Sequence, residues 1–432
     1  MRFPPRPAGS HLFPAGHLVP FLLVTVLFFL WGIPNNLNDV LIRHFMKSFE
    51  ITRFQAGLVQ SAFYLGYFLP AMPAALLMRR AGYKSGFVTG LVLFGAGAFL
   101  FWPAALAGSY GFFLFALFVI AGGLSFLETA SNPFIAQLGD ADSSERRLNF
   151  AQAFNPLGAI SGALIGTVFI FSGVELTPQE VAAQQASDSY EAYLRSETLR
   201  VVKPYLVIGA IALIWGVLIW RTKFPAIQGE HQSESGDRGR LRDLLRYPHF
   251  LFAVVAQFFY VGAQVGTWSY FISYVQEYAH QSEKGAGYFL TGTLVAFGVG
   301  RFVAAWLMRF VHPGKLMGSY CIANIILLAV AVLKPGWVGL WCVFLTSFFM
   351  SLMFPTIFAL GLKELGRNTK LGGSLLVMAI VGGAVLTPLM GFLSEITHSL
   401  ALAYSIPLLA YLIIGIYSYW GSEPRNAHLV GG

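Results

Sequence analysis

Apolar stretches of the length needed to cross a lipid bilayer recur along the whole chain. A helix needs roughly 20 apolar residues to span the hydrocarbon core. Of the 432 residues, 56% are hydrophobic and only 11% are charged, which is too little charge to cover the surface of a soluble protein of this size. Only helices and closed barrels satisfy their backbone groups in lipid, and these stretches do not alternate as barrel strands do. The sequence therefore predicts an all-α integral membrane protein.

Twelve membrane-spanning helices are predicted. They cover residues 18–43, 55–78, 85–106, 110–138, 149–172, 204–221, 248–278, 285–311, 315–333, 337–362, 371–394 and 399–420. The polar stretch 222–247 is rich in Gly, Ser and charge, as linkers are. We therefore expect a tail over 1–17, an N-terminal six-helix bundle over 18–221, a linker over 222–247, a C-terminal six-helix bundle over 248–420 and a second tail over 421–432. Thr177 followed by Glu180 has the spacing of a capping box and predicts a short surface helix.

The loop charges predict the orientation of the chain. Lys and Arg are enriched in the segments on the side of both termini, so the termini, the linker and the tails are expected in the cytoplasm. The net charge of +8 reflects these loops and does not indicate nucleic acid.

The motif "LMR" recurs in the same relative place, at 77–79 and 307–309. Together with a weaker match between 132–139 and 354–361, it indicates two copies of a six-helix unit, as in transporters that alternate access to a central site.

Among the charged side chains within predicted spans, three stand out at membrane depth, where a charge costs at least a few kcal/mol. They are Asp39, Glu128 and Arg301. Such residues face a cavity or a partner, and are functional candidates by default. No metal-ligand spacing and no nucleophile with a base accompanies them, so an enzyme is not expected. Two cysteines give no disulfide framework.

Asp39 belongs to the stretch "WGIPNNLNDVLIRHF" over 31–45. If the first helix continues through it, Asn35, Asn36 and Asp39 share one face. With Asn38 nearby, these carboxylate and amide groups suit the hydroxyls of a sugar. The alternative is that the helix ends at Ile33 and the asparagines form a loop.

Glu128 follows a long apolar run, with Asn132 one turn later. A desolvated carboxyl holds its proton more tightly, which suits a proton carrier. Gln152 and Asn155, one turn apart on the fifth span, are candidates for the same site. For Glu128 the alternative is a neutral side chain that only packs. For Gln152 and Asn155 it is helix–helix hydrogen bonding.

The second half offers a weaker set of candidates. Gln257, Tyr260, Gln264 and Trp268 step by three or four residues, and form either the opposite wall of the site or an ordinary packing stripe. Arg301 is expected to pair with an acid or with carbonyl groups near the end of the eighth span, in a structural or gating role.

The stretches "FFLWGIPNNLNDVLIRHF", "LETASNPFIAQLG", "LNFAQAFNPLGAI", "QFFYVGAQVGTWSYFI" and "FPTIFALGLKELG" make the chain resemble the fucose–proton symporter family of the major facilitator superfamily. The resemblance extends from about 20 to 420. It implies the fold of that superfamily, a location in a bacterial inner membrane, a monomer, and uptake of a small sugar with protons and without an organic cofactor. By the resemblance, Asp39 and Glu128 are the essential carboxylates, and Asn36, Gln152 and Asn155 line the sugar cavity.

One position departs from the fucose carriers. Met353 and Phe354 stand before the proline of the tenth span, where those carriers have Gln-Tyr, so a hydroxyl contact is lost. Phe354 is accordingly expected to gate or to pack. The glucose/galactose and N-acetylglucosamine carriers are more similar here, so these sugars, and sodium in place of protons, remain alternatives. A sugar receptor that does not transport and a drug exporter are two further alternatives, and the amides argue against the exporter.

Overall fold

Twelve helices long and apolar enough to cross a membrane run up and down the structure. This computed structural model describes residues 17–138, 147, 150–225, 241–308, 310–365 and 368–422. The spans are Leu18–Ser48, Arg53–Met78, Arg80–Ala107, Tyr110–Ile135, Phe150–Ile170, Tyr190–Arg221, Pro248–Ser269, Glu283–Leu307, Pro313–Leu333, Trp337–Leu362, Leu375–Thr397 and Leu400–Gly421. The predicted number of spans is confirmed.

The individual elements are shorter, because several spans contain a break. The first half comprises α1 (Leu18–Ser48), α2 (Arg53–Phe68), α3 (Ala71–Phe99), α4 (Phe101–Ala107), α5 (Tyr110–Gln137), α7 (Phe154–Ile165), the π-helix η2 (Gly166–Ile170), α8 (Pro178–Ala186), α9 (Tyr190–Leu199) and α10 (Val202–Arg221). The second half comprises α11 (Leu241–Leu244), α12 (Pro248–Ser269), α13 (Phe271–Ala279), α14 (Glu283–Leu307), α15 (Pro313–Leu333), α16 (Trp337–Met350), α17 (Met353–Leu362), α18 (Thr369–Met378), η5 (Ala379–Val381), α19 (Gly382–Thr397), α20 (Leu400–Ala403), α21 (Ser405–Ile416) and η6 (Tyr417–Gly421).

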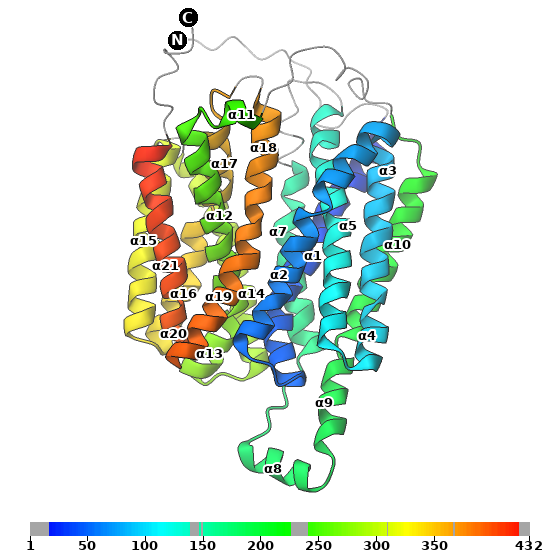
Figure 1. Ribbon diagram of the computed structural model, residues 1–432, viewed down its shortest axis with the longest axis vertical. Helices are drawn as coiled ribbons and strands as arrows, with labels where there is room; N and C mark the ends of the chain where they lie inside the picture. Colours follow the sequence, from blue (N-terminus) through cyan, green and yellow to red (C-terminus); the bar gives the residue numbers. More distant parts are fainter. Residues whose placement is uncertain are drawn as a thin grey trace, which may run out of the picture.

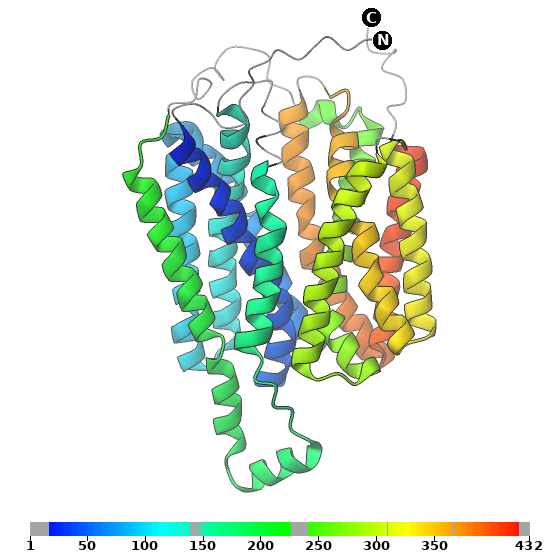
Figure 2. The ribbon, with the colours of Figure 1, turned by 180° about the vertical axis from the view of Figure 1, so that it is seen from behind.

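The helices of the two halves stand side by side as two groups (Figure 1). We call them the first bundle (α1–α10) and the second bundle (α12–η6). Helix α1 begins and η6 ends at the same end of the molecule, which we call the terminal end (Figure 2). At the opposite end α8 and α9 project as a hairpin, and we call this the hairpin end. The bundles meet where α2 packs on α19 and α7 packs on α14.

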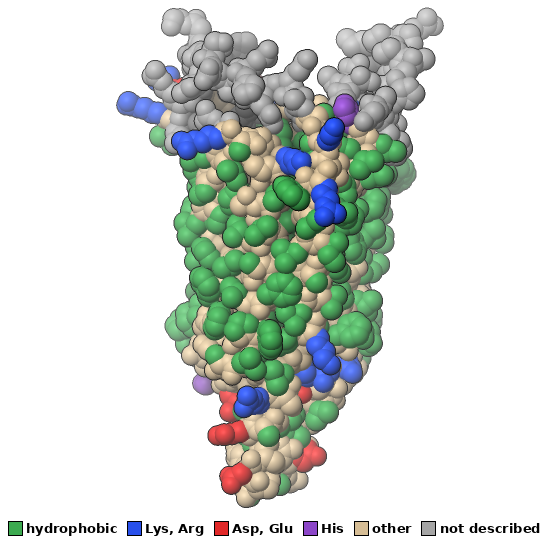
Figure 3. Space-filling model, turned by 90° about the vertical axis from the view of Figure 1, so that its right-hand side faces the viewer, with side chains coloured by type: hydrophobic (Ala, Val, Ile, Leu, Met, Phe, Trp, Pro, Cys, Tyr) green, Lys and Arg blue, Asp and Glu red, His purple; other side chains and the backbone are tan. Residues whose placement is uncertain are grey.

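Apolar side chains form a band across the middle of the face that Figure 3 shows. Lys and Arg gather at its two edges, and Asp and Glu gather on the hairpin. Large apolar side chains within the band are open to the outside, including Phe302 at 77% and Leu333 at 79% exposure. A soluble protein rarely exposes so broad an apolar surface, and this band is the lipid-facing surface.

Helix α1 is continuous through the asparagine-rich stretch and ends only at Ser48. The alternative of a loop after Ile33 is therefore wrong. Pro34 lies inside the helix, where it lacks the N–H that would bond to the carbonyl of Leu30.

The capping-box helix is confirmed as α8, where Thr177 and Glu180 bond reciprocally. The predicted seventh span is interrupted at Tyr270, whose φ of −105° and ψ of 2° separate α12 from α13.

Glycines let α1 and α7 approach closely. A methyl group built on Gly158 would lie 2.1 Å from the Phe29 carbonyl oxygen, and one on Gly162 would lie 2.2 Å from that of Ile33. Small residues allow the same close approach in other membrane helix pairs. This contact sets α7, with Asn155, against the polar face of α1.

Candidate functional site

A cavity of about 290 Å³ lies between the two bundles. Small-molecule sites in proteins occupy roughly 300 to 1,000 Å³, so this one suits a small solute. Helices α1, α2, α5 and α7 line it from the first bundle, and α12, α14, α17 and η5 line it from the second. Among the sequence-predicted residues it brings together Asn35, Asn36, Asp39, Glu128, Asn132, Gln152, Asn155, Gln264, Trp268, Arg301 and Phe354.

The two walls of the cavity differ in chemistry. The first bundle contributes both carboxyl groups and six amides, from Asn35, Asn36, Gln60, Asn132, Gln152 and Asn155. The second bundle contributes mostly apolar and aromatic side chains, from Val261, Val265, Trp268, Leu294, Phe297, Phe354 and Ile380, with Gln264 and Arg301 as its polar members. Such a site fits a solute with several hydroxyls and an apolar face, which describes a sugar ring.

Asp39 is held between the two bundles. Its Oδ1 accepts a hydrogen bond from Gln60 Nε2 of α2 at 2.9 Å and another from Ser269 Oγ of α12 at 3.0 Å. The side chain is only 2% exposed. A charged carboxylate in such a dry position costs several kcal/mol, whereas a protonated one keeps a carbonyl oxygen that accepts both bonds.

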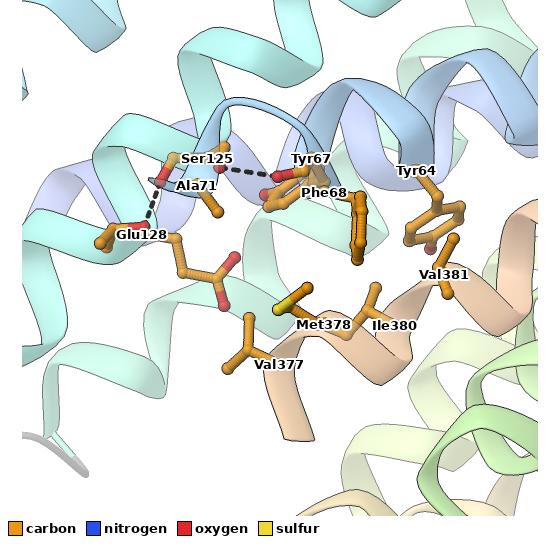
Figure 4. A pocket seen from close by; sticks show the side chains of 11 residues that line it. Tyr64, Tyr67, Phe68, Ala71, Ser125, Glu128, Val377, Met378, Ile380 and Val381 are labelled. Atoms are coloured by element: carbon orange, nitrogen blue, oxygen red, sulfur yellow. Dashed lines mark hydrogen bonds between the residues drawn. The ribbon is translucent and has the colours of Figure 1, made fainter. Parts of the chain in front are cut away.

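Glu128 faces two spaces at once. It lines the central cavity and also a small adjoining pocket of about 30 Å³ (Figure 4). In that pocket its carboxyl group extends from α5 toward Met378 and Ile380 of the second bundle. The Tyr67 hydroxyl lies beside Glu128 and Asn35. Glu128 thus lies where a polar and a largely apolar space adjoin.

The amides form a chain that begins one helical turn from Glu128. Asn132 Nδ2 donates to the Glu128 backbone oxygen at 3.3 Å, and Gln152 Nε2 donates to Asn132 Oδ1 at 3.2 Å. Asn155 Nδ2 donates to the Phe28 carbonyl oxygen at 3.3 Å. These long bonds leave donors and acceptors that a sugar hydroxyl can take over.

Three predicted residues do not line the cavity. Asn38 is fully buried on another face of α1, because a helix turns about 100° per residue and Asn38 is one position from Asp39 and two from Asn36. Gln257 and Tyr260 are fully buried within the second bundle. Phe354 packs against the Tyr260 ring at 6.3 Å and lines the cavity in its place.

Arg301 meets carbonyl groups and a ring. Its Nε donates to the Ser351 carbonyl oxygen at 3.3 Å, and its guanidinium carbon lies 4.9 Å from the centre of the Phe297 ring. Within the described part of the chain it forms no ion pair with an acid. Arg301 was expected to pair with an acid or with carbonyl groups, and the structure shows a carbonyl partner.

Gln60, Tyr64, Tyr67 and Ser269 were missed by the sequence reasoning. A lone glutamine in the apolar second span is a signal that could have found Gln60. Ser269 is one helical turn after Val265, which lines the cavity, so the periodicity of α12 is a signal that could have found it. Among the described residues, no group of three or more His, Cys, Asp or Glu side chains could hold a metal ion.

Polar contacts close the bundles against each other at the hairpin end. Lys47 of α1 pairs with Glu283 of α14 at 3.4 Å, and with Glu197 of its own bundle at 2.9 Å. Arg53 at the start of α2 pairs with Glu277 of α13. Beside them, Arg43 donates to the Gln276 amide oxygen. These contacts lie between the cavity and the hairpin end, so a solute cannot leave by that route without breaking them.

Comparison with known proteins identifies the family. Residues 21–370 match the Major Facilitator Superfamily. An Escherichia coli "L-fucose-proton symporter" is 44% identical over 411 residues, which are 94% of each chain. The chain belongs to the fucose–proton symporter family. It is therefore a multi-pass membrane transporter and not an enzyme.

Other members of the superfamily are also similar. A Brucella abortus "Glucose/galactose transporter" is 33% identical over 406 residues, 93% of each chain. The crystal structure of the superfamily transporter FucP in the outward conformation superimposes with a TM-score of 0.70, at 43% identity, over 94% of this chain and 99% of that one. The resemblance found in the sequence is confirmed, and so is the superfamily fold.

Proposed function

We propose that this chain carries L-fucose together with protons into the bacterial cytoplasm by alternating access. In this proposal the segments 18–221 and 248–420 are the two moving units of a monomer, and both termini face the cytoplasm. The relative named for L-fucose is 44% identical, whereas the relative named for glucose and galactose is 33% identical. The enrichment of Lys and Arg in the segments on the side of the termini supports the orientation.

One observation carries the proposal: two carboxyl groups and six amides share a single cavity between the bundles. The amides of the first bundle would bind the sugar hydroxyls, and the aromatic side chains of the second would cover its apolar face. Asp39 and Glu128 would each be charged when open to water and neutral when enclosed. Sugar and proton then move together, because the sugar favours closure and closure favours the protonated carboxyls.

Proton movement tests the function directly. L-fucose added to lightly buffered, energy-depleted cells that express the protein should make the medium more alkaline, and cells with the empty vector should not respond. Sugar uptake without any pH change would refute proton coupling, and uptake that requires sodium would replace the proton with that ion. Binding without exchange of labelled sugar in vesicles would identify a receptor.

A second candidate substrate is galactose or glucose, or else N-acetylglucosamine. Phe354 supports it, because this apolar ring lines the cavity at a position where, by the resemblance, the fucose carriers have a hydroxyl-bearing side chain. The same pH assay, run with each sugar, decides between them. A larger and more sensitive response to one of these sugars than to L-fucose would change the proposed substrate and leave the coupling intact.

A further inference from the structure

Ser269 occupies the break in the seventh span. It is the last residue of α12 and is fully buried. The interruption at Tyr270 turns the chain before α13 begins, and Ser269 Oγ lies against α1 of the other bundle. There Gln60 Nε2 donates to Ser269 Oγ at 3.0 Å, while both side chains donate to Asp39 Oδ1. The result is a ring of three hydrogen-bonded side chains.

The ring joins the two bundles. Asp39 and Gln60 belong to the first bundle and Ser269 to the second, so the bond from Ser269 to Asp39 exists only while the bundles are closed at the hairpin end. Separation there would return the Asp39 carboxyl to water. A charged carboxylate prefers that hydrated state, because burial removes its solvation. A neutral carboxyl tolerates the closed state, because its carbonyl oxygen keeps both donors.

We propose that Ser269 is a positioning residue that makes closure of the hairpin end depend on protonation of Asp39. The proposal rests on the proton-coupled transport proposed above and adds the partner through which the proton acts on the gate. Protonated Asp39 accepts the bonds from Ser269 and Gln60, and the bundles close. When Asp39 is deprotonated, its carboxylate is more stable in contact with water, and the two bundles separate at the hairpin end. Tyr64 of α2 faces Asp39, and Glu128 and Arg301 line the same cavity.

Opening of the hairpin end can be measured by the chemical labelling of a single cysteine. Val265 lines the cavity, so a Val265→Cys reporter reacts with a membrane-impermeant maleimide added at the hairpin side only when that end is open. Cys321 and Cys342 are first replaced by alanine, because both are free thiols. Because the thiolate is the reacting form of cysteine, each labelling rate is divided by the rate of the same cysteine in unfolded protein at the same pH. The corrected labelling rate of the parent with this reporter should rise with pH.

Ser269→Ala removes a hydrogen bond from the closed state alone. Labelling should therefore rise about three- to tenfold at a pH where the parent is mostly closed, as expected for the loss of one neutral hydrogen bond. Ser273→Ala is the matched control: Ser273 lies one turn further along, is buried, and its hydroxyl makes no hydrogen bond to the described residues. It should label like the parent. Ser269→Thr keeps the hydroxyl and should also label like the parent.

Asp39 variants separate coupling from simple packing. Asp39→Asn keeps an oxygen that accepts from Ser269 and Gln60 but cannot lose a proton, so labelling should be slow at every pH. Adding Ser269→Ala to Asp39→Asn should raise labelling by the same three- to tenfold factor. Adding it to Asp39→Ala should change little, because the shared acceptor is gone.

Two results would overturn the role of Ser269. One is equal labelling of the Ser269→Ala and Ser273→Ala proteins while the parent still responds to pH. The other is an equal gain in the Ser269→Ala and Ser269→Thr proteins, which would assign the effect to packing. A parent that transports sugar without moving protons would instead refute the proposed function, so the two failures are distinguishable.

Discussion

Gly162 of α7 lies so close to Ile33 of α1 that a methyl group on Gly162 would sit 2.2 Å from the Ile33 carbonyl oxygen. The neighbour is backbone and cannot move aside as a flexible side chain would. Gly162→Ala should therefore force the two helices apart and destabilise the protein by about 1–3 kcal/mol. Thermal unfolding of the purified transporter measures the loss. Gly298→Ala is the control, because nothing lies within 4 Å of the added methyl group. Equal unfolding temperatures for the two variants would contradict the close contact.

The amides on the cavity wall should set the affinity for sugar. Gln152→Ala and Asn155→Ala each remove polar groups that can bind a hydroxyl, and each should weaken binding of L-fucose by about 0.5–1.5 kcal/mol, or roughly two- to tenfold. Isothermal titration or competition binding measures this. Gln257→Ala is the control, because Gln257 is a buried amide of the second bundle that does not line the cavity. A larger loss in the Gln257 variant than in the other two would place the sugar elsewhere.

The two carboxyl groups should be needed for accumulation but not for all sugar movement. Asp39→Asn and Glu128→Gln keep the shape and the hydrogen-bond acceptor of each side chain without the titrating proton. Proton-driven accumulation of sugar should fall to the level of the empty vector, while exchange of labelled for unlabelled sugar in vesicles should persist. Accumulation at the level of the parent in either variant would show that the carboxyl in question does not carry the coupling proton.

The ion pair between Lys47 and Glu283 should stabilise the closed hairpin end. Glu283 is fully buried, and Lys47 lies within 3.4 Å. Glu283→Gln should weaken this contact by roughly 1.5–3 kcal/mol, as for a charge-assisted hydrogen bond. Faster labelling of the Val265→Cys reporter measures the effect. Glu180→Gln on the exposed hairpin is the control for the change of residue type, and it should leave the labelling rate as it is in the parent.

The hairpin itself should respond to acid. Hydrogen bonds from the Thr177 backbone N–H, at 2.7 Å, and from its hydroxyl, at 2.9 Å, lower the pKa of Glu180. Because the pKa of Glu180 is lowered, the contact stabilises α8 fully at pH values above the ordinary pKa of a glutamate. This stabilisation is lost as the pH falls through the lowered pKa. Amide hydrogen exchange over 178–186 should therefore be slower, after correction for the intrinsic rate, near neutral pH than in strong acid. Glu180→Gln should remove that difference.

Much of the architecture could be predicted because lipid imposes simple rules. The lengths of the apolar stretches gave all twelve spans, and the cost of intramembrane charge pointed to Asp39, Glu128 and Arg301. The helical spacing of Asn35 and Asp39 placed both at the cavity. In these cases the local sequence pattern directly determines where the residue lies, because the length of an apolar stretch sets the span and the helical spacing sets the face.

Other parts of the site depend on contacts that a local pattern does not contain. Gln257 and Tyr260 belong to the same helical stripe as Gln264 and Trp268, yet only the latter pair lines the cavity. Phe354 packs against the Tyr260 ring and lines the cavity there. Ser269 reaches Asp39 through the packing of the two bundles. Such positions follow from tertiary structure, and a residue pattern alone does not specify them.

The hairpin of α8 and α9 offers a practical handle on the topology of the protein. It projects beyond the apolar band, at the end opposite to the one where α1 begins and η6 ends. Ser187, at the turn between the two helices, is exposed and packs against neither bundle. A short epitope inserted there would be displayed on the opposite face of the membrane from one placed just after Ser422. Antibody staining of intact and permeabilised cells would then reveal which face is which.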